Sequence, residues 1–266
     1  GADAKGNMGL YPSYDTFGES SFLNASVAKS SVTRMTSASL GLDVQIPEKS
    51  VSRTRNMFIF PYKRAWAQEV TGVSRSAMKN VSTELSDIGV QFNISPARVK
   101  FSKPALVSID LKGKIPEEKL KKVGLYKSVD GVNFEYIESA VDALKLKGRI
   151  GESCIIGAFI DETPPSITDI NVKNGEMLTT DTKIFTANIR ENGSGVKAST
   201  IQFKIDGKLC EVRYDENRKQ VSYEPEAGLL SGAHTLEVIA VDRAGNASPV
   251  KSISFNVPKF SKDIVK

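Results

Sequence analysis

The sequence predicts an all-β protein made of two β-sandwich domains in tandem. Three observations lead to this prediction. Short runs in which apolar and polar residues alternate recur along the 266 residues, as they do in half-buried strands. Gly, Pro, Asn and Asp separate these runs, and such residues mark the turns between strands. Helical periodicity is scarce, and two consecutive prolines, Pro164 and Pro165, divide the chain into a longer and a shorter part.

Residues 1–160 are predicted to form the first sandwich domain. Expected strands with a period-two pattern include Leu42–Ile46, Asn56–Phe60 and Ala105–Asp110. Asp130-Gly131 predicts a hairpin turn whose second arm carries Phe134 and Tyr136. A short helix is expected at 116–122, where Pro opens the segment and acids precede bases. The first 38 residues are rich in Ser, as in a tail, and we expect an ordered segment held against the sandwich.

The boundary between the domains is predicted in the segment Asp161-Glu-Thr-Pro-Pro-Ser166. Neither proline can donate a backbone hydrogen bond, and each restricts the residue before it to an extended conformation. Residues 161–165 are therefore expected to form a semi-rigid linker. The second domain is then predicted at 166–258, followed by a C-terminal tail at 259–266.

The second domain is predicted to hold seven strands in about 90 residues, which is the immunoglobulin-type count. Asp206-Gly207 is a strong two-residue hairpin signal between the third and fourth strands. The expected strands are Ser166–Val172, Thr182–Arg190, Thr200–Ile205, Lys208–Tyr214, Gln220–Glu224, Gly232–Val241 and Val250–Val257.

A series of short motifs in this half resembles bacterial immunoglobulin-like domains. The resemblance implies a secreted or surface-anchored protein, since such domains occur there and in accessory regions of extracellular peptidases. The Cys-Trp-Cys core of antibody domains is absent. The motifs are Asp161-Glu-Thr-Pro-Pro-Ser-Ile167, Gly193-Ser-Gly195, Ser199-Thr-Ile201, Asp206-Gly207, Tyr214-Asp215, Gly232-Ala-His-Thr235 and Ala240-Val-Asp-Arg-Ala-Gly-Asn246.

A second progression of motifs, over about 120 residues of the first half, is similar to the β-sandwich domain of ankyrins and netrin receptors. It is also similar to regions that precede immunoglobulin-like domains in bacterial exoproteins. The motifs are Gly41-Leu-Asp-Val-Gln-Ile-Pro47, Met57-Phe-Ile-Phe-Pro61, Phe92-Asn-Ile-Ser-Pro96, Val99–Val107, Val123-Gly-Leu-Tyr126 and Asp130-Gly-Val-Asn-Phe134.

Composition removes several classes of function. With one histidine and two cysteines, zinc hydrolases and enzymes that need a His base are disfavoured. A net charge of +5 is spread along the chain, so no nucleic-acid partner is expected. No apolar run approaches the length of a membrane span, so no membrane insertion is expected. Cys154 and Cys210 are expected to be free, because a disulfide would have to join the two predicted domains.

The candidate site residues are few. Tyr62, Arg64 and Trp66 form a cluster that could stack on a sugar ring, and core burial of Trp66 is the alternative. Asp242 and Asn246 could offer oxygen atoms to calcium, but one loop with a single carboxylate predicts a structural role in a turn and no metal site. His234 is expected to be an edge-of-strand residue that needs no partner. We expect no catalytic residues and no cofactor.

Two functions are consistent with these observations. The first is a non-catalytic extracellular or cell-surface module for binding, adhesion or spacing, with a cell-wall polysaccharide or a protein as ligand. The second is an enzyme-linked role, either as accessory domains of a secreted peptidase or cell-wall hydrolase whose catalytic domain lies outside this chain, or as a carboxylate-based glycosidase. The chain begins at Gly1 without Met, and we expect that an export signal has been removed.

Overall fold

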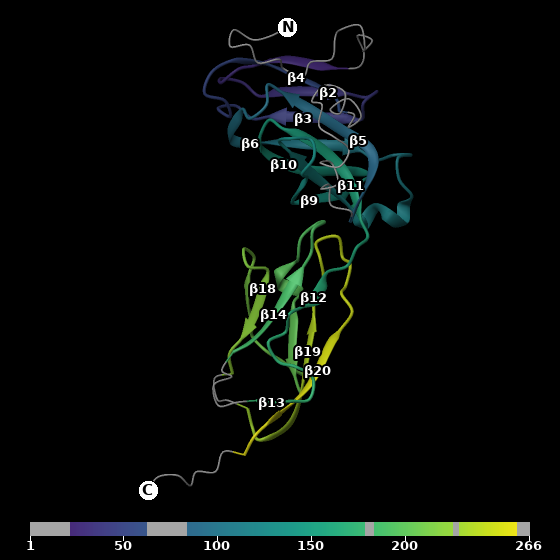
Figure 1. Ribbon diagram of the computed structural model, residues 1–266. Helices are drawn as coiled ribbons and strands as arrows, with labels where there is room; N and C mark the ends of the chain where they lie inside the picture. The colour runs from purple at the N-terminus through teal and green to yellow at the C-terminus, as the bar shows by residue number, and fades with distance from the viewer. Residues whose placement is uncertain (1–21, 63–83, 179–183, 226–228, 260–266) are drawn as a thin grey trace. The chain divides into compact units, whose positions relative to one another are not determined.

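The computed structural model is all-β, and it describes residues 22–62, 84–178, 184–225 and 229–259 (Figure 1). The chain divides into two compact units between Glu162 and Thr163. Each unit is a β-sandwich of two sheets with its own apolar core, and each is described by itself below.

The first unit pairs a six-stranded sheet, in the order β1-β4-β5-β11-β7-β8, with a five-stranded sheet, in the order β2-β3-β6-β10-β9. All pairings in these two sheets are antiparallel. The strands are β1 (Leu23–Val27), β2 (Thr33–Ser37), β3 (Leu42–Ile46), β4 (Arg55–Pro61), β5 (Leu85–Ser95), β6 (Lys100–Asp110), β7 (Val123–Ser128), β8 (Glu135–Ile137), β9 (Ser139–Asp142), β10 (Lys145–Glu152) and β11 (Ile155–Asp161).

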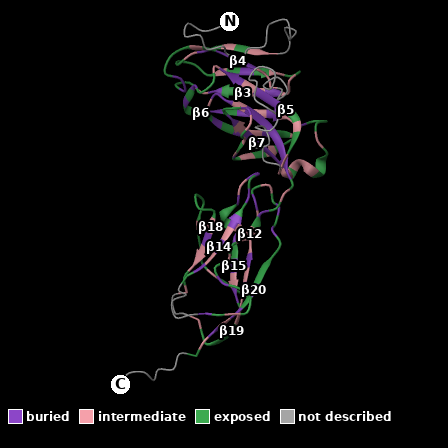
Figure 2. Cartoon of the chain, viewed as in Figure 1, coloured by how far each residue is buried: buried purple, intermediate pink, exposed green. Residues whose placement is uncertain are grey.

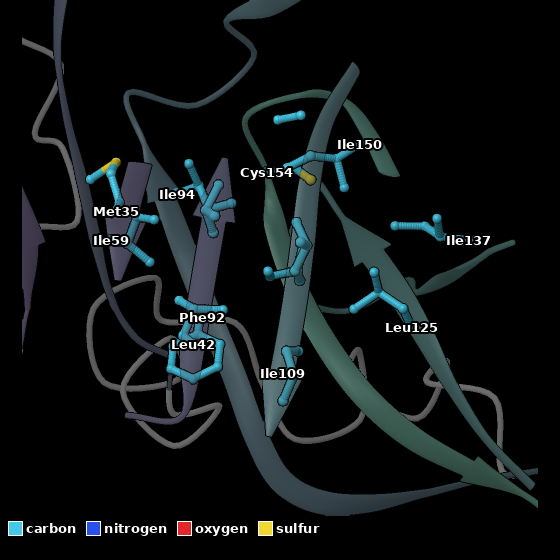
Figure 3. Packing of buried hydrophobic residues seen from close by; sticks show 14 of the residues in the cluster. Met35, Leu42, Ile59, Phe92, Ile94, Ile109, Leu125, Ile137, Ile150 and Cys154 are labelled. Atoms are coloured by element: carbon cyan, nitrogen blue, oxygen red, sulfur yellow. The ribbon is translucent and has the colours of Figure 1, made fainter. Parts of the chain in front are cut away.

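The core of the first unit lies between these sheets because alternate strand residues point inward. In β3, Leu42 and Val44 are buried and pair in register with Ile109 and Val107 of β6. Figure 3 shows Leu42 and Ile109 in the same cluster as Phe92 of β5 in the other sheet. Buried positions recur along the strands of both units (Figure 2).

In the described part of the N-terminal segment, residues 23–27 and 33–37 are the strands β1 and β2, so this part is ordered and held in the sandwich as expected. Two other sequence predictions for the first unit need correction. The expected helix is a 3-10 helix, η4 (Glu117–Lys122), and none of its residues is buried. Asp161, assigned to the linker by its sequence context, ends β11 and is fully buried. The β7–β8 hairpin around Asp130-Gly131 is confirmed.

The second unit pairs a four-stranded sheet, in the order β12-β14-β18-β17, with a five-stranded sheet, in the order β13-β20-β19-β15-β16. One further short 3-10 helix is η5 (Ala198–Thr200). The strands are β12 (Ser166–Thr168), β13 (Glu176–Met177), β14 (Phe185–Arg190), β15 (Gln202–Ile205), β16 (Lys208–Leu209), β17 (Arg213–Asp215), β18 (Gln220–Tyr223), β19 (Gly232–Ile239) and β20 (Lys251–Val257).

This strand order is that of an immunoglobulin-like sandwich. In that fold the first, second, fifth and fourth strands form one sheet, and the third, sixth and seventh form the other. Here β12, β14, β18 and β17 make the first sheet, and β15, β19 and β20 make the second. Phe185, Phe203 and Phe255 fill the centre of the core, and the ring centroids of Phe185 and Phe255 lie 5.4 Å apart. The predicted fold class is confirmed.

One predicted strand of this unit is wrong in a way that matters for the fold. The run Lys208–Tyr214 was expected to be continuous, but it is two strands, β16 and β17, in different sheets. The hairpin before it is confirmed, because Ile205 pairs with Lys208. Asp206 and Gly207 both have positive φ, 51° and 76°, as a type I′ turn requires.

Candidate functional site

Of the predicted contact cluster, only Tyr62 lies among the described residues, since Arg64 and Trp66 fall outside them. Tyr62 follows β4, and its backbone N–H donates to the carbonyl oxygen of Gln91 at 2.9 Å. The half-buried ring packs on the β7–β8 turn, where its hydroxyl lies 3.5 Å from the carbonyl oxygen of Gly131. A Cβ atom at position 131 would lie 2.0 Å from this hydroxyl and would displace the Tyr62 ring, and the φ of 75° at Gly131 also favours glycine.

Four aromatic rings gather on the face of the six-stranded sheet that points away from the core, and we call them the outer aromatic cluster: Tyr126, Phe134, Tyr136 and Phe159. Tyr126 makes edge contacts with Tyr136 and with Phe159, each at 5.5 Å between ring centroids. Phe134 and Phe159 are 4.7 Å apart. The neighbours of Tyr126 on β7, Val123 and Leu125, point into the core, which places Tyr126 on the opposite face.

Two glycines make room for this outer aromatic cluster. A Cβ atom at Gly157 would lie 2.7 Å from the ring of Phe159, and one at Gly124 would lie 2.9 Å from the ring of Tyr136. Tyr126 and Phe159 are buried, while Phe134 and Tyr136 are half-buried. Rigid aromatic rings supply large contact areas at low entropic cost, which suits them to ligand binding.

The turn beside this cluster is held by Asp130. Its Oδ1 atom accepts hydrogen bonds from the backbone N–H groups of Val132 and Asn133, each at 2.8 Å, and from the hydroxyl of Ser128. Partial burial raises the pKa of Asp130, but these bonds and one from the Asn133 side chain outweigh it and lower the pKa to about 2. The turn is therefore preorganised around an ionised carboxylate.

At one end of the second unit, Asp242 closes the loop 242–246. Its Oδ1 accepts from the backbone N–H of Asn246 and its Oδ2 from the side-chain amide of Asn246, both at 2.7 Å. A neighbouring loop is tied to this one, because Arg243 N–H donates to Gly195 O and Ala244 N–H donates to Ser194 Oγ. These bonds are those of a side-chain-capped turn, the role that the sequence predicts for Asp242 and Asn246.

The loop 242–246 contributes one carboxylate, but a second carboxylate lies beside it in the structure. The buried carboxylate of Glu191, at the end of β14, has an oxygen atom within 4.8 Å of one of Asp242. Carboxylate oxygens are the atoms that calcium prefers, so these are the residues of the second unit that could hold such an ion. Sequence reasoning missed Glu191 because 51 positions separate it from Asp242.

His234 has partners, so the expectation that it needs none is wrong. Its Nδ1 atom lies 2.7 Å from Oδ2 of Asp206, and its Nε2 atom lies 2.7 Å from the carbonyl oxygen of Leu230. The ring stacks on Phe255 with centroids 5.5 Å apart. Burial lowers the pKa of His234, but the bonds to Leu230 and Asp206 raise it above its ordinary value.

Both cysteines are free thiols, as expected. Cys154 is buried in the core of the first unit, as Figure 3 shows, and this burial raises its pKa to about 12. A thiol with such a pKa is not a nucleophile at neutral pH. Within the described part of the chain, no helix has the length and apolar character to span a membrane.

Neither a family model nor a curated protein matches the chain. Among solved structures, CopC from Methylosinus trichosporium OB3b is similar at 16% identity and a TM-score of 0.29, covering 35% of this chain and 93% of CopC. The fibronectin(III)-like modules of Clostridium thermocellum CbhA are similar at 18% identity and a TM-score of 0.26, covering 35% of this chain and 96% of that one.

The immunoglobulin-like assignment of the second unit rests on its own strand order. The resemblance of the first unit to ankyrins and netrin receptors stays a prediction.

Proposed function

We propose that this chain is a non-catalytic module that acts outside the cell or at its surface, for binding, adhesion or spacing. The observation that carries the proposal is the position of the one histidine. His234 is held between Asp206 and Leu230 and stacks on Phe255, so both ring nitrogens already have structural partners. A histidine used in this way is not available as a general base.

Other groups support the same conclusion. The buried thiol of Cys154 is kept protonated, and Asp130 and Asp242 serve as caps of turns. An extracellular place is supported by the resemblance of the second unit's motifs to bacterial immunoglobulin-like domains. A secreted hydrolase with its catalytic domain in another part of the protein remains the alternative role.

Tyr62 and the two half-buried rings of the outer aromatic cluster, Phe134 and Tyr136, form the contact surface that we propose for a polysaccharide or protein ligand, and the buried rings of Tyr126 and Phe159 support them. Phe134, Tyr136 and Tyr62 are half-buried and lie around one hairpin, next to a turn fixed by Asp130. Aromatic faces of this kind pair with the apolar face of a sugar ring or with an apolar side chain. The proposal keeps Tyr62 from the predicted contact cluster and adds residues that sequence reasoning did not find.

The test is a binding and hydrolysis assay with insoluble peptidoglycan and other polysaccharides, casein and model esters. We expect retention on at least one polymer and no release of product. Tyr136→Ala and Phe134→Ala should each weaken retention about two- to tenfold, the loss expected for one aromatic contact. Tyr214→Ala, a half-buried aromatic of the second unit, is the matched control. Turnover that one Asp or Glu substitution abolishes would overturn the proposal.

A further inference from the structure

The surroundings of His234 contain a feature that a structural histidine does not require. Both atoms that its ring nitrogens face are hydrogen-bond acceptors: Oδ2 of Asp206 and the carbonyl oxygen of Leu230, each at 2.7 Å. A neutral imidazole has one N–H donor and one bare nitrogen that accepts. In the neutral form, one of these two contacts would therefore bring two acceptors together. Only the imidazolium ion donates to both.

The rest of the environment also favours the charged ring. Asp206 is held in place because its Oδ1 accepts from the N–H of Thr235 at 2.8 Å, while its own N–H donates to the carbonyl oxygen of Thr235. The ring of Phe255, on the neighbouring strand β20, lies nearly parallel to the imidazole at an interplanar angle of 26°. A cation over an aromatic face is stabilised by the ring quadrupole.

The other charged groups around the ring can be named from the elements that pack on it. The β15–β16 turn presents Asp206, and β16 presents Lys208, whose charge helps to lower the pKa of Asp206. Strand β20 presents the apolar Phe255. The side chain of His234 is only 10% exposed, so solvent screens its pairing with Asp206 less than that of a surface ion pair.

We propose that His234 is a pH-sensitive latch: as the imidazolium ion it ties the chain at Leu230 to the β15–β16 turn, and on losing its proton it releases that tie. Leu230 lies before β19 and its own side chain is 84% exposed, so at this position the bond from His234 is not backed by packing of the Leu230 side chain, whereas the neighbouring Leu229 packs on the core. The latch is a property of the second unit and does not depend on the proposed binding function.

The direction of the pH effect follows from linkage. The folded-state pKa of His234 is raised, so the latch is complete below the ordinary histidine value near 6.5 and is lost as pH rises through the folded-state pKa. The pKa of Asp206 is lowered, so its part in the latch is present above about 3.9 and is lost in stronger acid. The latch therefore holds in mildly acidic solution, below about pH 6.5, and opens as the pH rises through the raised pKa of His234.

The chain has one histidine, so a long-range proton–nitrogen correlation spectrum of the full chain shows one imidazole. We expect both ring nitrogens to be protonated at pH 6.5 and the titration midpoint to lie above 6.5. Asp206→Asn leaves an Asn-Gly pair, which also favours a type I′ turn, while it removes the charge and replaces one acceptor oxygen with a donor NH2 group. It should lower the midpoint by about one pH unit or more, whereas Asp215→Asn, in another turn of the same unit, should not move it.

Amide hydrogen exchange provides the second measurement. After correction for intrinsic rates, the amides at 229–233 should exchange faster above the titration midpoint than below it in the wild-type chain. In Asp206→Asn they should exchange fast on both sides of pH 6.5. A neutral ring in the wild-type chain at pH 6.5 would overturn the proposal even if the variant failed to fold. If the exchange rates of the amides at 229–233 did not change across the titration midpoint of His234, the proposed release of the chain at Leu230 would be wrong.

Discussion

The two units are both sandwiches, yet they bury different kinds of polar group. Among the described residues of the first unit, the buried polar side chains are neutral apart from Asp161: Ser50, Gln91, Ser95, Ser128 and Ser153. In the second unit they gather in the loops that join the strands and include two carboxylates: Glu191, Ser194, Asp242, Asn246 and Ser248. Burying a charge is costly unless it is hydrogen-bonded, so these loops must be held in one geometry.

The strands of the first unit are also longer than those of the second. The first unit contains β5 and β6 with 11 residues each, whereas the longest strand in the described part of the second unit is β19 with 8. Long strands supply many ladder bonds and many inward side chains. The difference indicates that the first unit is held mainly by its apolar core, and that the second depends more on side chains that tie its loops.

The largest expected effect tests whether the units are independent. Phe203 is fully buried in the second core, and Phe203→Ala should cost about 3–5 kcal/mol of unfolding free energy. Differential scanning calorimetry of the full chain should show the second unit's transition at a much lower temperature and the first unit's transition unchanged. Ile109→Ala, in the first core, is the matched control: it should lower the temperature of the first unit's transition and leave the second unit's transition unchanged. If either substitution shifted both unfolding transitions, the two units would not be independent.

The next effect concerns the buried loop of the second unit. Asp242→Ala removes both acceptors of Asn246 and should cost about 1.5–3 kcal/mol, because the bonds involve a buried charged group. Asp215→Ala removes a similar cap in an exposed turn and should cost only about 0.5–1 kcal/mol. Both are measured by urea unfolding in the presence of a chelator. Equal costs would show that burial of the loop adds nothing.

The features of the fold that could be predicted from sequence are those formed by residues close to one another in the chain. Asp206-Gly207 was predictable because a type I′ turn is decided by the two residues themselves. The break between β16 and β17 was not, since Cys210–Val212 contains no Gly, Pro, Asn or Asp. The partner of His234 lies 28 residues away in a turn that only the sheet register brings near.

The proposed contact surface was also only partly predictable, because most of its residues lie far apart in the chain. Tyr62 was identified from its neighbours in the chain, but the outer aromatic cluster is assembled from β7, β8 and β11 together with the loop residue Phe134. A local signal existed for it. Gly124 and Gly157 interrupt strands whose other residues are mostly large, and such glycines often mark a close approach of another group.

Acid should reveal one charge on which the stability of the first unit depends. Asp130 has a pKa of about 2 in the folded chain, below the ordinary 3.8, so its contribution is present above pH 4 and is lost between pH 4 and pH 2. Asp130→Asn should flatten the decline of the first transition over that range. The measurement is the midpoint of thermal unfolding from pH 5 to pH 2. An unchanged slope would mean that the turn does not limit acid stability.

The smallest effect separates the two thiols. Cys154 is buried, with a pKa of about 12, while Cys210 is only partly buried and its pKa is raised by that burial. A thiol reagent at pH 7.5 should label Cys210 in the folded chain and Cys154 only after unfolding. Cys210→Ser should then abolish labelling of the native protein, which mass spectrometry can measure. Fast labelling of Cys154 would show that the first core opens readily.

The pairing of β13 with β20 determines how the second unit would resist stretching. These two short strands run parallel, with Glu176 opposite Phe255, and backbone bonds from Gly175 to Ser254 and from Leu178 to Asn256 flank them. The chain reaches β13 from its N-terminal side and leaves β20 on its C-terminal side. A tensile load on the two ends of the unit therefore pulls these parallel strands in opposite directions along their length. Their hydrogen bonds would then be sheared together and would not open one at a time, so we expect this small patch to resist stretching of the second unit.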